Sequence, residues 1–92
     1  MVKDRRYLTV KILIDAGHVK SLLEVFDTLP RSILARDFGT NYSRFSRLIE
    51  NPEQFKLKEI YTLAKLLEID ELTMLTLVHN HYTNTRPKRK SN

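Results

Sequence analysis

A single glycine divides the most informative stretch of this chain, RSILARDFGTNYSRFSRLIE at residues 31–50. Apolar residues precede it at helical spacing: Ile33, Leu34 and Phe38. Ala35 beside them is small enough to let another helix come close. Gly39 can adopt the positive φ that ends a helix without a Cβ penalty, and Asn41 can cap the next helix through its side-chain oxygen. The stretch therefore predicts two short helices joined by a tight turn.

The second of these helices is expected to have two different faces. Its apolar residues would point inward: Phe45, Leu48 and Ile49. At 100° per residue the opposite side and its flanks carry polar and basic residues: Tyr42, Ser43, Arg44, Ser46, Arg47 and Glu50. A small basic face rich in hydroxyl groups is thus predicted to point away from the core.

This arrangement resembles the helix-turn-helix of the lambda-repressor and Cro family of bacterial and phage regulators. The resemblance rests on five positions that match the spacing of that family: Leu34, Ala35, Gly39, Phe45 and Leu48. The chain departs from the family at three places. Arg31 stands where the family usually has a Gln, and Lys56 replaces its usual Ser or Thr cap. The family also has a Glu soon after the position of Leu48, where this chain has Ile49 and then Glu50.

The resemblance implies an all-α fold, a five-helix lambda-repressor-like domain over residues 19–82 whose second and third helices form the hairpin. The run LKEIYTLAKLLEIDELTML resembles the fourth helix of the family and the start of its fifth. Residues 1–18 would be an N-terminal extension outside the family pattern. Residues 83–92 are expected to be a disordered basic tail, because Thr83, Asn84 and Thr85 are poor helix formers and Pro87 follows.

Apolar spacing predicts three further helices. Residues 19–28 would turn one face inward: Val19, Leu22, Leu23 and Phe26. Residues 57–69 have a similar stripe: Leu57, Ile60, Leu63, Ala64 and Leu67. Residues 70–82 would begin at the cap residue Asp70 and bury five side chains, with Leu77 partly off the stripe: Leu72, Met74, Leu75, Val78 and Tyr82.

The pattern in residues 7–15 fits two structures. Alternating apolar residues are typical of a strand: Leu8, Val10, Ile12 and Ile14. Another set makes a helical stripe: Tyr7, Val10, Leu13 and Ile14. Asp4 as a cap and Gly17 as a stop favour the helix. The alternative is an edge strand that pairs two chains, in which case this segment is the dimerisation element.

Composition narrows the class of protein. Ninety-two residues are enough for one domain, and the absence of cysteine excludes disulfides and thiolate metal sites. The longest apolar run, residues 12–14, is far too short for a membrane span, and no secretory signal is evident, so we expect a soluble cytoplasmic protein. The net charge is +5, but four of these charges lie in the tail. Residues 31–51 carry +2 and residues 52–82 carry −2, which favours the hairpin as the side that meets a polyanion.

If the resemblance holds, the chain is a small transcriptional regulator that binds double-stranded DNA with its second hairpin helix in the major groove. The expected base contacts are Asn41, Tyr42, Ser43, Arg44, Ser46 and Arg47. The forked guanidinium of arginine matches guanine O6 and N7, and asparagine can pair with adenine. The expected phosphate contacts are Arg31, Ser32, Lys56, Lys58 and the tail residues Arg86, Lys88, Arg89 and Lys90.

The same sequence pattern is also compatible with other roles. The same face could be a solvated surface whose arginines pair with Asp37 and Glu50, or it could contact a protein, so that the fold serves as an interaction module without DNA binding. The sequence has no recognisable nucleophile elbow or phosphate-binding loop, so it does not predict an enzyme or a cofactor. His79 and His81 would point in different directions on a helix, which disfavours a metal site. A homodimer is possible, with pairing through residues 7–15 or the last helix around Leu77.

Overall fold

The computed structural model describes residues 4–85, and within this range the regular secondary structure is all helical, without a strand. The elements in chain order are α1 (Arg6–Asp15), α2 (Leu22–Val25), α3 (Arg31–Phe38), α4 (Tyr42–Glu50), the short 3-10 helix η1 (Pro52–Gln54), α5 (Leu57–Leu67) and α6 (Glu71–Thr85). The all-α prediction is confirmed. None of the helices in this range is long and apolar enough to cross a membrane.

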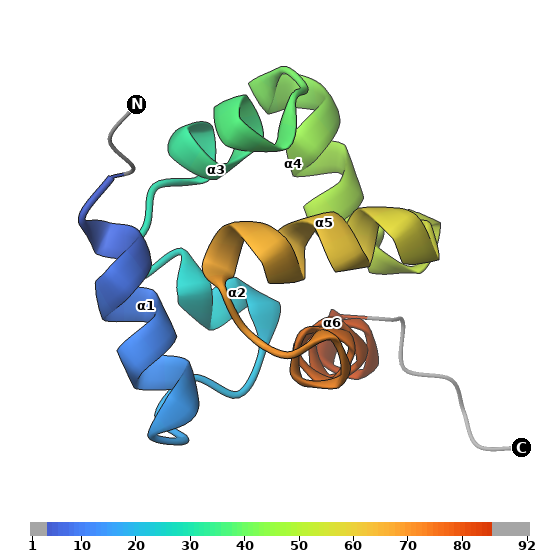
Figure 1. Cartoon of the computed structure of the whole chain (residues 1–92). Helices are drawn as coiled ribbons and strands as arrows, with labels where there is room; N and C mark the ends of the chain where they lie inside the picture. The colour runs from blue at the N-terminus through green and yellow to red at the C-terminus, as the bar shows by residue number, and fades with distance from the viewer. Residues whose placement is uncertain (1–3, 86–92) are drawn as a thin grey trace, which may run out of the picture.

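Helix α5 is the element around which the others pack. It crosses the middle of the molecule in Figure 1, with α1 beside its C-terminal end, α3 and α4 above it and α6 below it. Its inward stripe is buried as predicted, at Ile60, Leu63, Ala64 and Leu67, whereas Leu57 in the first turn is exposed. Helix α5 thus packs against α1, α3 and α6.

Phe45 occupies the centre of the hairpin side of the core and is completely buried. The Phe26 ring meets it edge to face at a centroid distance of 6.2 Å, and the tilted Phe38 ring lies at 5.5 Å. Both arrangements fall within the range favoured by aromatic pairs. The three rings join the segment after α2 to α3 and α4, so they set which side of α4 faces inward.

The hairpin of α3 and α4 confirms the prediction for residues 31–50. Gly39 adopts a left-handed conformation with φ of 95° and donates its N–H to the carbonyls of Ala35 and Arg36, both at 3.1 Å. Asn41 then accepts a hydrogen bond from the Arg44 N–H through its side-chain oxygen at 2.7 Å. The residues that predicted the stop and the start of the two helices therefore perform those roles.

Residues 7–15 are helical, and the alternative strand is wrong. The Asp4 carboxylate accepts the Arg6 backbone N–H at 2.9 Å just before α1 begins, and Gly17, with φ of 81°, follows its end. The inward residues are Tyr7, Val10 and Ile14, which belong to the same core as the other helices. Leu8 and Ile12, which completed the strand-like alternation, lie on the solvent side.

The helix predicted for residues 19–28 is much shorter than expected. Only Leu22–Val25 is α-helical, and three-residue turns follow it, in which the N–H groups of Phe26, Asp27 and Thr28 bond to carbonyls three residues earlier. The tighter turns bring Val25 and Leu29 into the core. Leu23, predicted to point inward, is exposed.

Helix α6 is rotated relative to the prediction. Asp70 caps it as expected, accepting the N–H groups of Leu72 and Thr73, but the helix continues through Thr85. The buried residues are Met74, Leu77, Val78 and His81, whereas Leu72 is 70% exposed, Leu75 is exposed and Tyr82 is half-buried. Met74 and Val78 are buried as predicted, but because α6 has apolar residues on two sides, spacing alone did not distinguish the buried Leu77 from the exposed Leu72. Leu77, proposed as a pairing surface, is therefore part of the core.

His81 has a structural role that the sequence did not reveal. Its Nε2 lies 2.6 Å from the Ile49 carbonyl oxygen, at the last turn of α4. A carbonyl only accepts, so Nε2 must carry the proton and donate. This buried hydrogen bond joins α6 to the end of α4, while the neighbouring His79 is exposed.

Substitutions at two positions of α4 test the inward orientation of Phe45. We expect Phe45→Ala to lower the free energy of unfolding by about 3–5 kcal/mol, because it leaves a cavity between two aromatic rings. Tyr42→Ala, at an exposed position of the same helix, should change it by less than about 0.5 kcal/mol. Urea unfolding measures both, and equal losses would contradict the orientation. Phe45→Leu provides a milder variant if the alanine protein does not fold.

Candidate nucleic-acid interface

The outer side of α4 presents most of the residues that were predicted to contact bases. Asn41, Tyr42, Ser43, Arg44 and Arg47 are all exposed. They lie opposite or beside the buried stripe of Phe45, Leu48 and Ile49. The helix thus separates a core side from a polar side, and the polar side carries two arginines and an aromatic ring that is 53% exposed.

Arg44 makes only a weak contact with an acidic neighbour. Its Nη2 lies 3.9 Å from a carboxylate oxygen of Glu59, and the Arg44 side chain is 59% exposed. The other Glu59 oxygen accepts the Lys56 backbone N–H at 2.8 Å and so caps the start of α5. Surface pairs at this separation contribute little to stability, so the Arg44 guanidinium is free to move to another anion.

The arginines of α4 do not pair with the acidic residues suggested for a purely solvated face. Asp37 instead accepts a hydrogen bond from Arg36 at 3.0 Å. Within residues 4–85, Arg47 forms no ion pair. The charge of Arg47 is therefore not balanced by a contact in the described part of the protein.

An open hollow of about 610 Å³ lies where α3 meets the start of α4. Ser32 and Arg36 of α3 line it from one side, and Asn41 and Tyr42 line it from the other. The structure thus places Ser32, an expected phosphate contact, next to two expected base contacts. Arg36 was not among the predicted site residues, although its position four residues after Ser32 puts it on the same helix face.

The other expected phosphate contacts are spread over the surface. Arg31 is half-buried, with its guanidinium carbon 5.2 Å from the centre of the Phe26 ring, a cation–π contact that anchors the start of α3. Lys56 and Lys58 are exposed at the start of α5, and both come shortly before Glu59, whose carboxylate lies 3.9 Å from Arg44. Arg86, Lys88, Arg89 and Lys90 lie outside the described residues.

Ser46, also predicted to contact a base, differs from the other residues of this set because its hydroxyl is covered. Its Oγ is buried and has no hydrogen-bond partner among the described residues. On the helical wheel Ser46 lies between the buried stripe and the outer face, and packing around α4 covers it. Ser46 is therefore part of the boundary of the core rather than of the exposed surface.

A partly buried hydrogen bond holds α3 against α1 behind this surface. The Tyr7 hydroxyl donates to the Asp37 carboxylate at 2.8 Å, and Arg36 donates to the other carboxylate oxygen. Burial raises the pKa of the Tyr7 phenol, and the bond to Asp37 adds to this rise, so the phenol keeps its proton. Desolvation alone would raise the pKa of Asp37, but the hydrogen bonds from Arg36 and Tyr7 outweigh it and lower that pKa.

The lowered pKa of Asp37 predicts a pH-dependent contribution to stability. The ionised carboxylate stabilises the fold above the ordinary aspartate pKa of about 4, and this contribution is lost as the pH falls through the lowered value. We expect Asp37→Asn to lower the free energy of unfolding at neutral pH by about 1 kcal/mol. The free energies of unfolding of Asp37→Asn and of the original protein should become equal at acidic pH, where Asp37 is protonated.

Urea unfolding over a pH series measures this difference. Asp27→Asn is the matched control, because Asp27 is exposed and forms no ion pair within the described range, so it should leave stability nearly unchanged. If the difference in free energy of unfolding between Asp37→Asn and the original protein stays constant down to acidic pH, the charge of Asp37 does not contribute to stability.

Comparisons of the chain with protein-family models, with curated proteins and with solved structures find no match. The resemblance to the lambda-repressor family therefore stays a prediction that rests on the residues of the hairpin.

Proposed function

We propose that this protein binds duplex DNA through the outer side of α4, as a small regulator of the lambda-repressor-like helix-turn-helix kind. The observation that carries the proposal is the set of exposed side chains on α4, Tyr42, Ser43, Arg44 and Arg47, directly after a tight turn. An α-helix fits the major groove of B-form DNA, and the residues near its start reach the base edges.

Each exposed group on this side has a suitable partner on DNA. Arg44 and Arg47 can donate two hydrogen bonds to guanine, Ser43 can bond to a base or a phosphate, and the Tyr42 ring can pack on a sugar or a thymine methyl group. Asn41 is occupied as the cap of α4 through its oxygen. Its amide nitrogen remains able to donate to an acceptor.

Hydroxyl and basic side chains next to α4 are suited to contact DNA phosphates. Ser32 and Arg36 share the hollow with the first residues of α4, and Lys56 and Lys58 lie at the start of α5. Residues 31–51 carry a net charge of +2, although residues 1–85 together carry only +1. We infer that electrostatic attraction is concentrated on the hairpin side and is moderate in strength.

The first test compares variants of a chain that ends at Thr85, so that the basic tail does not contribute. We expect Arg44→Ala and Arg47→Ala each to weaken binding to a cognate duplex by about 1–3 kcal/mol if they contact bases. The matched control is Lys20→Ala combined with Lys65→Ala, which removes the same charge from exposed positions away from α4. Fluorescence anisotropy with duplexes enriched from a random library measures each affinity.

If the control pair weakens binding as much as the arginine pair, the attraction is general and α4 is not the binding surface. If the chain ending at Thr85 binds no duplex at low salt, the DNA proposal fails for the folded domain. The exposed Tyr42 would then favour the alternative of a protein-interaction module, since exposed aromatic residues often anchor protein interfaces.

The tail is tested separately through salt dependence. Removing residues 86–92 deletes four positive charges, and each phosphate that they neutralise contributes about 0.9 to the slope of log affinity against log salt. We expect the slope for a generic duplex to fall by about 3–4 if all four make contact. An unchanged slope would show that the tail does not follow the DNA backbone.

A further inference from the structure

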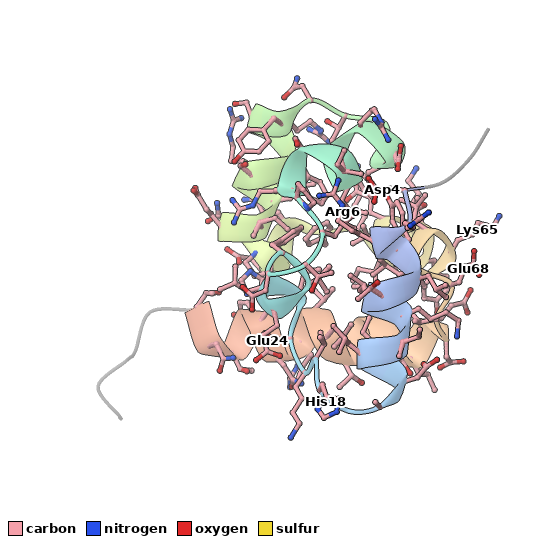
Figure 2. All side chains as sticks on the ribbon, turned by 90° about the vertical axis from the view of Figure 1, so that its left-hand side faces the viewer. Asp4, Arg6, His18, Glu24, Lys65 and Glu68 are labelled. Carbon is pink, nitrogen blue, oxygen red and sulfur yellow. The ribbon has the colours of Figure 1, made fainter. Side chains whose placement is uncertain are left out.

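The outer side of α1 carries an apolar pair that no other element covers. Leu8 is 61% exposed and Ile12 is 57% exposed, one helical turn apart, on the side opposite Tyr7, Val10 and Ile14. In Figure 2, α1 lies toward the viewer with no other helix in front of it. Two large aliphatic side chains in this position suggest an interaction surface.

Opposite charges flank the apolar pair on the same stripe of the helix. Arg5 lies one turn before Leu8, is exposed and forms no ion pair among residues 4–85. Asp15 lies one turn after Ile12, and its side chain is 56% exposed although it bonds to Lys11 at 2.8 Å. The stripe therefore runs from a positive end through an apolar centre to a negative end.

We propose that two copies of this chain pair through α1 in antiparallel orientation. A two-fold axis makes the interface the same on both copies, so it must be complementary to itself. Antiparallel pairing centred between Leu8 and Ile12 places Leu8 of one protomer against Ile12 of its partner, and Arg5 against Asp15 at both ends. Parallel pairing would set arginine against arginine and aspartate against aspartate, which is repulsive.

The surface around Leu8 includes a hollow. It has a volume of about 270 Å³ and lies between α1 and the end of α5, lined among others by Tyr7, Leu8, Lys11 and Leu67. Lys65 of α5 and Glu68, the residue directly after this helix, extend beside α1 in Figure 2. The hollow is large enough to receive an aliphatic side chain of the partner, such as Ile12.

The pairing is independent of the DNA proposal, because no residue of α4 takes part. One pair of helices forms a small interface, so we expect a weak association that depends on protein concentration. The Tyr7–Asp37 bond places α3 at the N-terminal end of α1. Antiparallel pairing therefore places the two α3–α4 hairpins at opposite ends of the dimer.

The lack of cysteine in this chain allows a direct test by cross-linking. Full-length chains are made with Arg5→Cys or with Asp15→Cys and are treated, alone or mixed, with a short bismaleimide over a concentration series. In the antiparallel pair position 5 faces position 15, so the mixture should yield a cross-linked dimer. Each variant alone should yield little, because equivalent positions would be about 15 Å apart along the helices, ten residues at about 1.5 Å each.

Adding Ile12→Glu to both cysteine chains should abolish the mixed cross-link, because it places a charge in the apolar centre. Thr62→Glu, at an exposed position on α5, is the matched control and should leave the cross-link intact. Circular dichroism verifies that the variants remain folded. Cross-linking of each variant alone, absence of a mixed product at all concentrations, or a mixed product unaffected by Ile12→Glu would overturn the proposal.

Discussion

Burial of Phe45 is the interaction on which the arrangement of the candidate site depends. The rings of Phe26 and Phe38 surround it, and no part of its side chain reaches solvent. Burying an aromatic side chain of this size stabilises the fold by about 1.5–3 kcal/mol, and this gain is lost if α4 rotates about its axis. The position of one ring therefore determines that Arg44 and Arg47 face outward.

Hydrogen bonds near the ends of helices also hold α4 and α3 in place. Asn41 caps the start of α4, and His81 donates to the Ile49 carbonyl near its end, so both ends of this helix are held. Tyr7 and Asp37 hold α3, the other half of the hairpin, against α1. A helix that is fixed before binding loses less conformational freedom when it meets a partner, which favours affinity from a small set of contacts.

The two surfaces proposed for binding lie on different elements and have different chemistry. The outer side of α4 is polar and basic, whereas the outer stripe of α1 has an apolar centre with opposite charges at its ends. Residues 1–85 carry little net charge, so attraction to DNA would depend on where the charges lie rather than on their sum. Pairing through α1 would leave both α4 surfaces open.

The sequence by itself determined the hairpin and most of the exposed surface of α4. Gly39 and Asn41 act on their immediate neighbours, and α4 has apolar residues on only one side, so local rules were sufficient. The end of α3, the start of α4 and the inward stripe of α5 apart from Leu57 could be predicted for the same reason. Ser46 lies at the margin of the buried side, where spacing does not distinguish a covered hydroxyl from an exposed one.

Tertiary packing decided what local rules left ambiguous. Helix α6 has apolar residues on two sides, so only the positions of its neighbours determine that Leu77 is buried while Leu72 is exposed. The short α2 also depends on packing, since tight turns after it bring Leu29 into the core. Periodicity reports which faces of a helix can be buried, but the chain has one core, and its location selects the face.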